Sequence, residues 1–470
     1  MSEMIPESWA RTILGDVISI SSGQGLTKSK MIEGEIPVFG GNGVTGWHND
    51  SNIEKETIAI GRVGYYCGSV HLTPKRAWIT DNAFITSFDE KVMGQKFLYL
   101  LLTNADLRQN DSSTAQPVIS GAKVYPIEIN LPPLAEQKVI ADKLDELLAQ
   151  VESTKARLDA IPAILKSFRQ SVLAAAVSGK LTEEWREKCA YTPASISLDE
   201  IKVSRINRLG KKSPSKTHLL SEEYIIPESW QWVSLDFLSL KIVDGTHHTP
   251  TYIDAGIPFI SVKDIKNGQI NFESTKFISE AEHDTLSKRC KPEIGDLLIT
   301  KSGTIGRTAI VKQCIEFSLF VSVALIKPVS SMVNMQFIDI ALQKWVNEID
   351  VSSRIVGTAI KNLHLQDMKV LAIPFAPIEE QTEIVRRVEE LFALADKVEV
   401  QVNAAQARVN NLTQSILAKA FRGELTADWR AANPELISGD NSAEALLKRI
   451  KAERAKLKPV KKTTAKKAKA

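Results

Sequence analysis

Several features that would narrow the function are missing from this chain of 470 residues. Its four cysteines (Cys67, Cys189, Cys290 and Cys314) are far apart and form no CxxC pair, so we expect reduced thiols rather than disulfides or a zinc site. Its first ten residues carry acidic groups and a proline, unlike a signal peptide. It has no run of about 18 apolar residues, which argues against a membrane span. We therefore expect a cytoplasmic protein with no membrane partner.

The chain also lacks the short motifs of common enzyme classes. It has no GxxxxGK[ST] loop, because the glycine-lysine pairs at Gly179 and Gly210 lack the remaining residues. It has no Asn-Pro-Pro-aromatic signature of an amino-methyltransferase, no HExxH and no GxSxG, and its acids form no nuclease-like constellation. We therefore expect no catalytic residue, bound cofactor or metal ion in this chain, and a role in recognition and assembly.

Two local patterns match ligand sites only formally. Residues 41–46 fit GxGxxG, but residues 47–50 (Trp-His-Asn-Asp) are typical of a turn, whereas a dinucleotide fold needs a helix there. A polar loop that enters a groove fits better. His247 and His248 have no further metal-type ligands nearby, so ordinary loop histidines fit better than zinc. We expect three tryptophans in the core: Trp47, Trp78 and Trp232.

Charge is spread unevenly along the chain. The whole chain carries +3, but residues 448–470 hold eleven basic residues and one acid, so the other 447 residues sum to −7. Residues 1–130 contain eleven basic and fourteen acidic side chains, and residues 224–376 contain fifteen and sixteen. Bulk charge therefore gives no support for nucleic-acid binding by the folded body. The lysine-rich end is either a solubilising segment or a non-specific phosphate-binding arm.

Two segments of the sequence are duplicated. Residues 5–9 (Ile-Pro-Glu-Ser-Trp) recur at 226–230, an offset of 221. Residues 133–186 align without a gap on 377–430, an offset of 244, with 19 identities in 54 positions. The offsets differ by 23, so the second globular region should carry about that many extra residues.

The longer repeat has the pattern of a coiled-coil helix. Apolar residues follow 4-3 spacing from Ile140 to Val172 and from Ile384 to Ile416, and only Thr154 is polar. Each helix should begin after a proline (Pro133, Pro377) and end near a glycine (Gly179, Gly423), with a kink or restart at Pro162. Two matched runs in one chain favour antiparallel pairing within the chain over homodimerisation. Each seam would be roughly 50 Å long at the rise of an α-helix.

The two globular regions read as mixed strand and loop. Apolar strands at residues 57–60 and 296–300 each run into a glycine-rich turn that contains an arginine, Arg62 or Arg307. Each turn is either a tight turn with a solvated arginine or a contact for a phosphate or a guanine edge.

These motifs together resemble the specificity subunits of type I restriction-modification systems, and among them the enteric subclass that includes EcoKI. The likeness rests on residues 131–137 (Leu-Pro-Pro-Leu-Ala-Glu-Gln), 171–173 and 179–182 around the first helix, and on 377–381 and 423–426 around the second. It extends over nearly the whole chain. The lysine-rich end beyond Glu453 has no place in the family repeat.

The resemblance implies two target-recognition domains, each of which reads one half of a split double-stranded DNA site. The two helices would hold them apart and dock two methyltransferase subunits, to which restriction (translocase) subunits add. S-adenosylmethionine, ATP and Mg²⁺ would belong to those partners. The fold class is then α+β, with two globular target-recognition domains separated by two long helices that form an antiparallel intramolecular coiled coil.

The expected domains follow from the same alignment: target-recognition domains at 1–130 and 224–376, helical spacers at 131–187 and 377–430, a linker at 188–223 and a basic tail at 431–470. Candidate DNA-binding residues lie in the predicted turns: Lys28, Lys30, Asn42, Arg62, Lys75, Arg76, Lys263, Lys301, Arg307 and Lys361.

Two other functions stay open. A non-catalytic coiled-coil scaffold that binds proteins would have no affinity for duplex DNA and no methyltransferase partner. A nucleotide-dependent enzyme built on residues 41–46 would bind a cofactor as an isolated chain.

Overall fold

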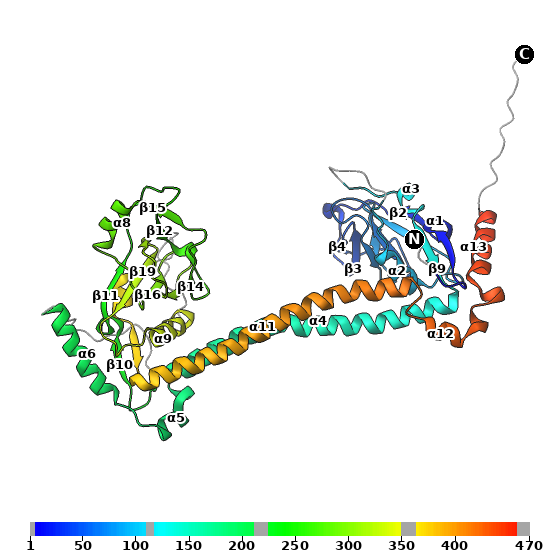
Figure 1. Ribbon diagram of the computed structural model, residues 1–470. Coiled ribbons are helices and arrows are strands. Elements are labelled where there is room, and N and C mark those ends of the chain that lie inside the picture. Colours follow the sequence, from blue (N-terminus) through cyan, green and yellow to red (C-terminus); the bar gives the residue numbers. More distant parts are fainter. Residues whose placement is uncertain (1–4, 110–116, 211–223, 349–362, 458–470) are drawn as a thin grey trace, which may run out of the picture. The chain divides into compact units, whose positions relative to one another are not determined.

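The computed structural model describes residues 5–109, 117–210, 224–348 and 363–457. The chain divides into two compact units: residues 1–159 with 404–470 (unit 1), and residues 160–403 (unit 2). Each unit joins a strand-rich region to one half of each of two 44-residue helices, α4 (Leu134–Val177) and α11 (Ile378–Phe421) (Figure 1). The predicted α+β class, with two globular regions and two long helices, is confirmed.

The strands of unit 1 form three small sheets. Strand β5 is buried along its whole length because it lies between two neighbours, whereas β1 alternates buried and exposed residues. The sheets, in order of neighbouring strands, are β1 (Ala10–Ile13) and β9 (Glu128–Leu131); β2 (Ser19–Ser22), β8 (Ala83–Ser87), β5 (Ile58–Gly61) and β6 (Val70–Leu72); and β4 (Gly43–His48), β3 (Ile36–Gly40) and β7 (Trp78–Ile79).

Unit 2 repeats this topology and adds one hairpin. Its strands β12 and β18 run parallel, as do β3 and β7 in unit 1. The sheets are β10 (Gln231–Ser234) and β20 (Ala372–Phe375); β11 (Ser239–Asp244), β19 (Val323–Pro328), β16 (Leu297–Thr300) and β17 (Thr308–Ile310); β15 (Lys276–Ile278), β12 (Ile257–Ile260) and β18 (Ser318–Leu319); and the added hairpin of β13 (Ile265–Lys266) and β14 (Gln269–Ile270).

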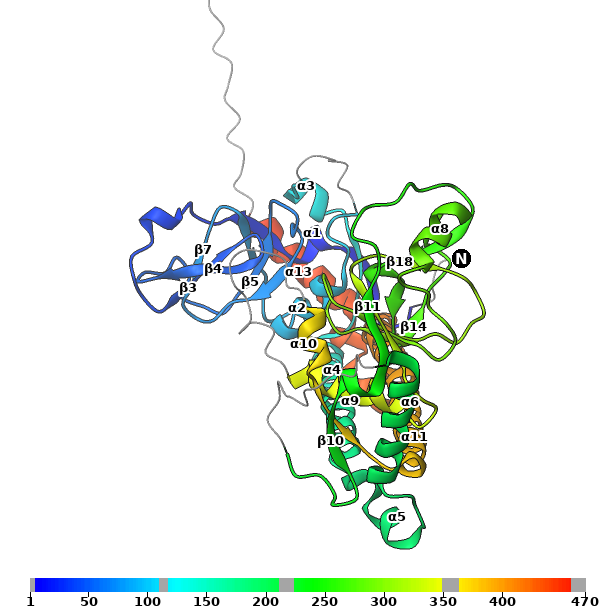
Figure 2. The ribbon, with the colours of Figure 1, turned by 90° about the vertical axis from the view of Figure 1, so that its left-hand side faces the viewer.

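The extra residues of unit 2 are concentrated in one place. Strand pairing makes Phe39 equivalent to Ile260, and Gly61 equivalent to Thr300. Phe39 and Gly61 are 22 residues apart in unit 1, whereas Ile260 and Thr300 are 40 apart in unit 2, so 18 of the 23 extra residues lie here. They account for the β13–β14 hairpin and for α8 (Glu280–Ser287), which lies beside β18 (Figure 2).

Shorter helices complete the two units. Those of unit 1 are α1 (Leu14–Val17), η1 (Lys28–Lys30), α2 (Gln95–Asn104), α3 (Gly121–Val124), α12 (Ala427–Ala432), η4 (Pro434–Leu436), η5 (Gly439–Asn441) and α13 (Ala443–Leu457). Those of unit 2 are η2 (Lys180–Thr182), α5 (Glu183–Lys188), α6 (Ala194–Leu209), α7 (Leu235–Leu238), η3 (Val262–Asp264), α8, α9 (Met335–Glu348) and α10 (Leu365–Lys369).

The long helices pair antiparallel within each unit. In unit 1, Lys143 Nζ donates to Leu425 O (3.2 Å) and Gln406 Nε2 to Asp159 Oδ1 (2.8 Å). In unit 2, Arg169 Nη2 binds both Asp396 (2.7 Å) and Glu399 (2.8 Å).

The seam between the helices follows the predicted 4-3 positions. All of these positions are buried or partly buried except Thr154 and Leu412. Pro162 lies inside α4 without ending the helix. By length and composition alone α4 could span a membrane, but such a single helix is weak evidence, and its seam residues pack within the protein.

Residues from both repeated segments of the sequence contact one another in a buried polar cluster of unit 1. In this polar cluster 1 the Glu136 carboxylate is fully buried and accepts hydrogen bonds from Trp9 Nε1 (2.8 Å), Thr426 Oγ1 (2.6 Å) and Arg430 Nη1 (2.5 Å). Gly423 has a φ of +79°, and a Cβ there would lie 2.5 Å from Pro6 Cγ. The cluster therefore joins the start of the chain, the start of α4 and the segment after α11.

Unit 2 contains the same cluster built from the other copies. In this polar cluster 2 the buried Glu380 carboxylate accepts from Trp230 Nε1 (2.7 Å), Thr182 Oγ1 (2.6 Å) and Arg186 Nη1. Gly179, with a φ of +73°, lies against Pro227 as Gly423 lies against Pro6. Each motif that the sequence carries twice thus has the same partners in both units.

The segment predicted as a basic tail from residue 431 is folded as far as Leu457. Helix α13 lies beside α1 and β1 (Figure 1), its Leu446 and Ile450 are part of the core of unit 1, and Lys451 pairs with Asp16 (3.1 Å). Helix α6 packs on the core of unit 2 through residues that include Ala194 and Ile201. The rest of the predicted tail, residues 458–470, lies outside the described residues.

Candidate nucleic-acid interface

Arg62 and Lys301 occupy the same position in the two units. Arg62 directly follows Gly61, and Lys301 directly follows the equivalent Thr300. Each donates its backbone N–H (2.8 Å) to the carbonyl of the residue just before the paired neighbouring strand, Asn82 before β8 or Ser322 before β19. The sequence paired Arg62 with Arg307 because both are arginines in glycine-rich turns. The strand register corrects this pairing, because it places Arg307 at the far end of its loop.

The guanidinium of Arg62 is partly buried and is not paired with a carboxylate of the described residues. Its guanidinium lies over the Phe84 ring (5.4 Å to the centroid), and Nη1 donates to Ser22 Oγ (3.3 Å). Its Nε is buried and has no hydrogen-bond partner in the described part of the chain. Among the described residues no carboxylate pairs with it. A guanidinium held by a ring and a neutral hydroxyl keeps its charge and donors available for an outside anion or a guanine edge.

The polar loop predicted at residues 41–46 lies against the loop that carries Arg62. Ser69 Oγ donates to Gly41 O (2.9 Å), and a Cβ at Gly61 would lie 2.1 Å from the same oxygen. Asn42 is exposed at the tip of the β3–β4 hairpin. Since a strand, β4, and not a helix follows residues 41 and 42, the segment lacks the helix that a dinucleotide site uses to hold its phosphates.

Four other predicted cations of unit 1 are exposed on separate loops. Lys28 and Lys30 lie in η1, while Lys75 and Arg76 lie between β6 and β7, where Arg76 pairs with the exposed Glu54 (3.7 Å). Exposed pairs of this kind contribute little to stability, so Arg76 is free to exchange its partner.

Several exposed aromatic residues near these loops were not identified from the sequence as candidate DNA-binding residues. Tyr65 and Tyr66 follow Arg62 in its loop, are 80% and 55% exposed, and contact each other edge to face (5.0 Å between centroids). Trp47 is 57% exposed, so its predicted place in the core is wrong. It lies on β4, whose side chains alternate between the two faces of the sheet, and the turn-like pattern of residues 47–50 hid that strand.

In unit 2 the equivalent lysine is enclosed. Lys301 is 5% exposed, and its Nζ pairs with the buried Asp244 carboxylate (3.0 Å), which also accepts from Arg289 Nη2 (2.6 Å). Burial alone would raise the pKa of Asp244, but hydrogen bonds from Lys301 and Arg289 outweigh burial, and the pKa lies below its usual value. Lys301 therefore contributes an internal ion pair rather than a surface cation.

Two predicted residues of unit 2 do lie at the surface, close to each other. Lys263 is exposed in η3, and Arg307 is exposed with Nη1 near Ile265 O (3.4 Å). The loop that carries Arg307 lies beside η3, because the Arg307 hydrogen bond is made to the residue that directly follows η3. Lys361 lies outside the described residues.

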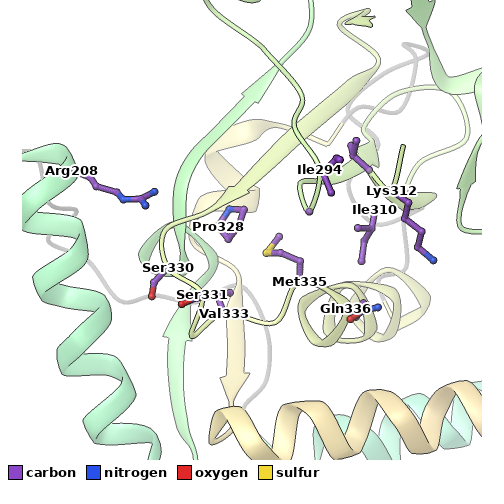
Figure 3. Close-up of a pocket in the computed structure, with 12 residues that line it drawn as sticks. Arg208, Ile294, Ile310, Lys312, Pro328, Ser330, Ser331, Val333, Met335 and Gln336 are labelled. Carbon is purple, nitrogen blue, oxygen red and sulfur yellow. The ribbon is translucent and has the colours of Figure 1, made fainter. Parts of the chain in front are cut away.

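A cavity of about 590 Å³ is present elsewhere in unit 2 (Figure 3). Its walls are mainly aliphatic and come from the β17 and β19 ends and the start of α9, with Arg208 of α6 and Lys312 at its edge. Within the described parts of the chain, no three His, Cys, Asp or Glu side chains converge on a metal position.

Comparison with known proteins relates the chain to one family. A model of the family described as "Type I restriction modification DNA specificity domain" matches residues 6–163 and 249–405. The chain is 38% identical over 468 residues to the EcoBI specificity subunit of Escherichia coli, covering 96% of this chain and 93% of the relative. It is 35% identical to the EcoDI subunit of the same organism (96% of each chain) and 37% identical to the EcoKI subunit of strain K12 (83% and 75%).

Solved structures share the fold at lower sequence identity. A chain from a study of assembly and conformational transition of the type I R-M system aligns with a TM-score of 0.57 at 18% identity, over 90% of this chain and 99% of that one. The HsdS subunit of Thermoanaerobacter tengcongensis aligns with a TM-score of 0.50 at 18% identity, over 90% and 100%. The duplicated arrangement of strands and long helices is thus a known one.

Proposed function

Because the chain belongs to the type I restriction-modification DNA specificity family, we propose that it is the sequence-reading subunit of such a system and that each unit reads one half of a split DNA site. One observation carries the proposal. The two units share strand order, long helices and polar clusters, yet differ at the position that Arg62 and Lys301 occupy. A duplicated support with different reading loops suits two different half-sites on one duplex.

The repeated helices are the parts that would dock two methyltransferase subunits. Docking two copies of one partner requires two equivalent surfaces, and the 19 identities between the helical repeats supply them. Restriction (translocase) subunits would then join through the methyltransferases. The alternative scaffold function uses the same helices but leaves the different reading loops without a role.

The chemistry of the system would belong to the partners. S-adenosylmethionine, ATP and Mg²⁺ would bind there, and this chain would be a non-catalytic subunit that decides where methylation takes place. The buried thiol of Cys290 is consistent with a non-catalytic subunit, because burial raises its pKa to about 11 and keeps it protonated and unreactive. We place the complex in the cytoplasm, where its DNA substrate is.

Within unit 1 we assign base or phosphate contact first to Arg62 and Asn42, which adjacent loops present together. Tyr65 and Tyr66 would lie against the same stretch of DNA. In unit 2 the corresponding surface residues are Lys263 and Arg307. These residues would position and read the duplex, while the buried pairs around them hold the loops.

Mapping methylated adenines tests the proposal. Cells that express the chain with its methyltransferase subunits should carry methylation at a two-part motif with an unspecified spacer. Replacing residues 1–130 by the corresponding region of a relative should change one part of the motif and leave the other. A complex that forms but methylates no site, or a replacement that alters both parts, would contradict the proposal.

A further inference from the structure

Unit 2 contains a second cavity, of about 270 Å³, beside the enclosed lysine. The turn after β11 forms one wall, and α8 with the residues that follow it forms the other. The residues that matter for its chemistry are Asp244, Thr246, His247, His248, Arg289 and Cys290. None of them was singled out from the sequence as a DNA contact.

The cavity carries an excess of positive charge. Asp244, the one buried carboxylate, is contacted by Lys301 Nζ (3.0 Å), Arg289 Nη2 (2.6 Å) and His247 Nε2 (3.3 Å). Lys301 is enclosed and balances the carboxylate by itself. The Arg289 side chain is 52% exposed and that of His247 64%, so the surplus guanidinium charge and the His247 ring face solvent at the cavity.

The backbone holds this wall in place before any ligand arrives. Thr246 N–H donates to Leu319 O (2.9 Å), Val321 N–H donates to Thr246 O (2.9 Å), and Arg289 Nη1 donates to Gly245 O (3.2 Å). Gly245 has to lack a side chain, since a Cβ would lie 1.9 Å from Leu319 O. A guanidinium anchored by two hydrogen bonds loses little further entropy on binding an anion.

The same place in unit 1 has a different composition but the same net charge. The bonds Gly23 N to Ala83 O and Gly245 N to Val323 O make these glycines equivalent, and therefore also the residues before them, Ser22 and Asp244. Unit 1 thus combines the neutral Ser22 with the cation Arg62. Unit 2 replaces that pair by Asp244 and Lys301, whose charges cancel, and Arg289 restores the single positive charge from the extra residues around α8.

We propose that this cavity is a phosphate site of unit 2, in which Arg289 binds a DNA backbone phosphate and the exposed His247 ring lies beside it. The inference rests on the proposed DNA-reading function. Other chemistries fit the cavity less well. The raised pKa of Cys290 leaves no thiolate for nucleophilic or redox chemistry. Asp244 is occupied by cations, and the described residues bring no three metal ligands together here.

The test measures binding of the complete complex, the chain with its methyltransferase subunits, to a duplex that carries the mapped motif and to an unrelated duplex. For Arg289→Gln we expect weaker binding to both duplexes by the same factor. The slope of log K against log salt concentration should also become shallower by about 1, because one phosphate contact is lost. Arg289→Lys should keep most of the slope, and Asp244 stays paired with Lys301 in both variants.

Lys291→Gln provides the matched control. Lys291 lies two residues away, carries the same charge and pairs with the exposed Glu316 (3.3 Å), outside the cavity. It should leave the salt slope at the wild-type value. The phosphate site is overturned if Arg289→Gln keeps the wild-type slope, if Lys291→Gln lowers the slope equally, or if Arg289→Gln changes only the preference between duplexes. A wild-type complex that does not prefer the motif duplex would overturn the proposed function as well.

Discussion

Arg430→Met in polar cluster 1 should destabilise unit 1 far more than the loss of a surface charge. Glu136 is fully buried, and among the described residues its carboxylate has one cationic partner, Arg430, besides the neutral donors Trp9 and Thr426. Removing one member of a buried ion pair leaves an uncompensated charge and costs about 3–5 kcal/mol. For a unit of this size that corresponds to a fall in melting temperature of roughly 6–20 °C.

Calorimetry and hydrogen exchange together would measure this effect and locate it. We expect faster exchange at amides of β1, β9 and the start of α4, with unit 2 unchanged. Arg76→Met removes the same kind of charge from an exposed pair with Glu54 and should cost less than about 1 kcal/mol.

A double variant examines the cause. Glu136→Gln combined with Arg430→Met removes both charges, so it should cost less than Arg430→Met alone. The reasoning is refuted if Arg430→Met costs no more than Arg76→Met, or if the protection lost is in unit 2.

Three further predictions concern the reading loops and unit 2. Lys301→Met should lower the free energy of unfolding by about 2–3 kcal/mol, since it removes a charged partner from Asp244. Arg62→Ala at the equivalent position should leave the free energy of unfolding unchanged and weaken binding of the motif duplex by about 1–3 kcal/mol. Urea titration of both variants measures the first effect and fluorescence anisotropy the second, and a stability loss in Arg62→Ala with none in Lys301→Met would contradict these assignments. Because the pKa of Asp244 is depressed in the folded state, its ionisation stabilises unit 2 above its unfolded pKa, and this contribution is lost as the pH falls through the folded pKa. The difference in stability between wild type and Asp244→Asn should therefore shrink as the pH falls below 3.8, the usual pKa of this carboxyl, and a difference that grows on acidification would contradict the sign. Burial raises the pKa of Asp339, and its buried Oδ1 has no hydrogen-bond partner within the described segments. Asp339→Asn should therefore increase stability at neutral pH by roughly 1 kcal/mol, and a fall in melting temperature would disprove that account.

The polar clusters explain why the two repeats have different offsets. Residues 5–9 and 226–230 mark the starts of the strand-rich regions, while residues 133–186 and 377–430 begin at the helices. The extra residues of unit 2 lie between the two repeated segments, so the offset between equivalent residues grows from 221 to 244. Both repeated segments still meet at one carboxylate in each unit, Glu136 or Glu380.

The long helices could be predicted because their signal is local and periodic. Spacing of 3.5 residues, prolines before the helices and glycines after them are all visible in the sequence, and the structure follows them. The restart that was one expectation at Pro162 does not occur. The remaining hydrogen bonds and the seam hold α4 continuous through it, although a proline alone favours a break.

The candidate interface was predicted less well because exposure and partners depend on contacts distant in sequence. Lys301 and Arg62 look alike as cations after short apolar strands. Only the fold shows that Asp244, 57 residues earlier in the chain, neutralises one of them while Ser22 leaves the other charged. Trp47 is a further case, since the side of β4 on which it lies depends on the pairing of β4 with β3.

The sequence by itself determined that the chain is duplicated, that two long helices pair within it, and to which family it belongs. These conclusions rest on repeats and periodicity, which residues express through their own spacing. The tertiary structure alone decided which motifs meet at Glu136 and Glu380, that residues 443–457 fold as a helix in unit 1, and which cations remain available to DNA. Such properties come from pairs of residues far apart in the chain, whose charges and donors cancel or remain free only when folding brings them into contact.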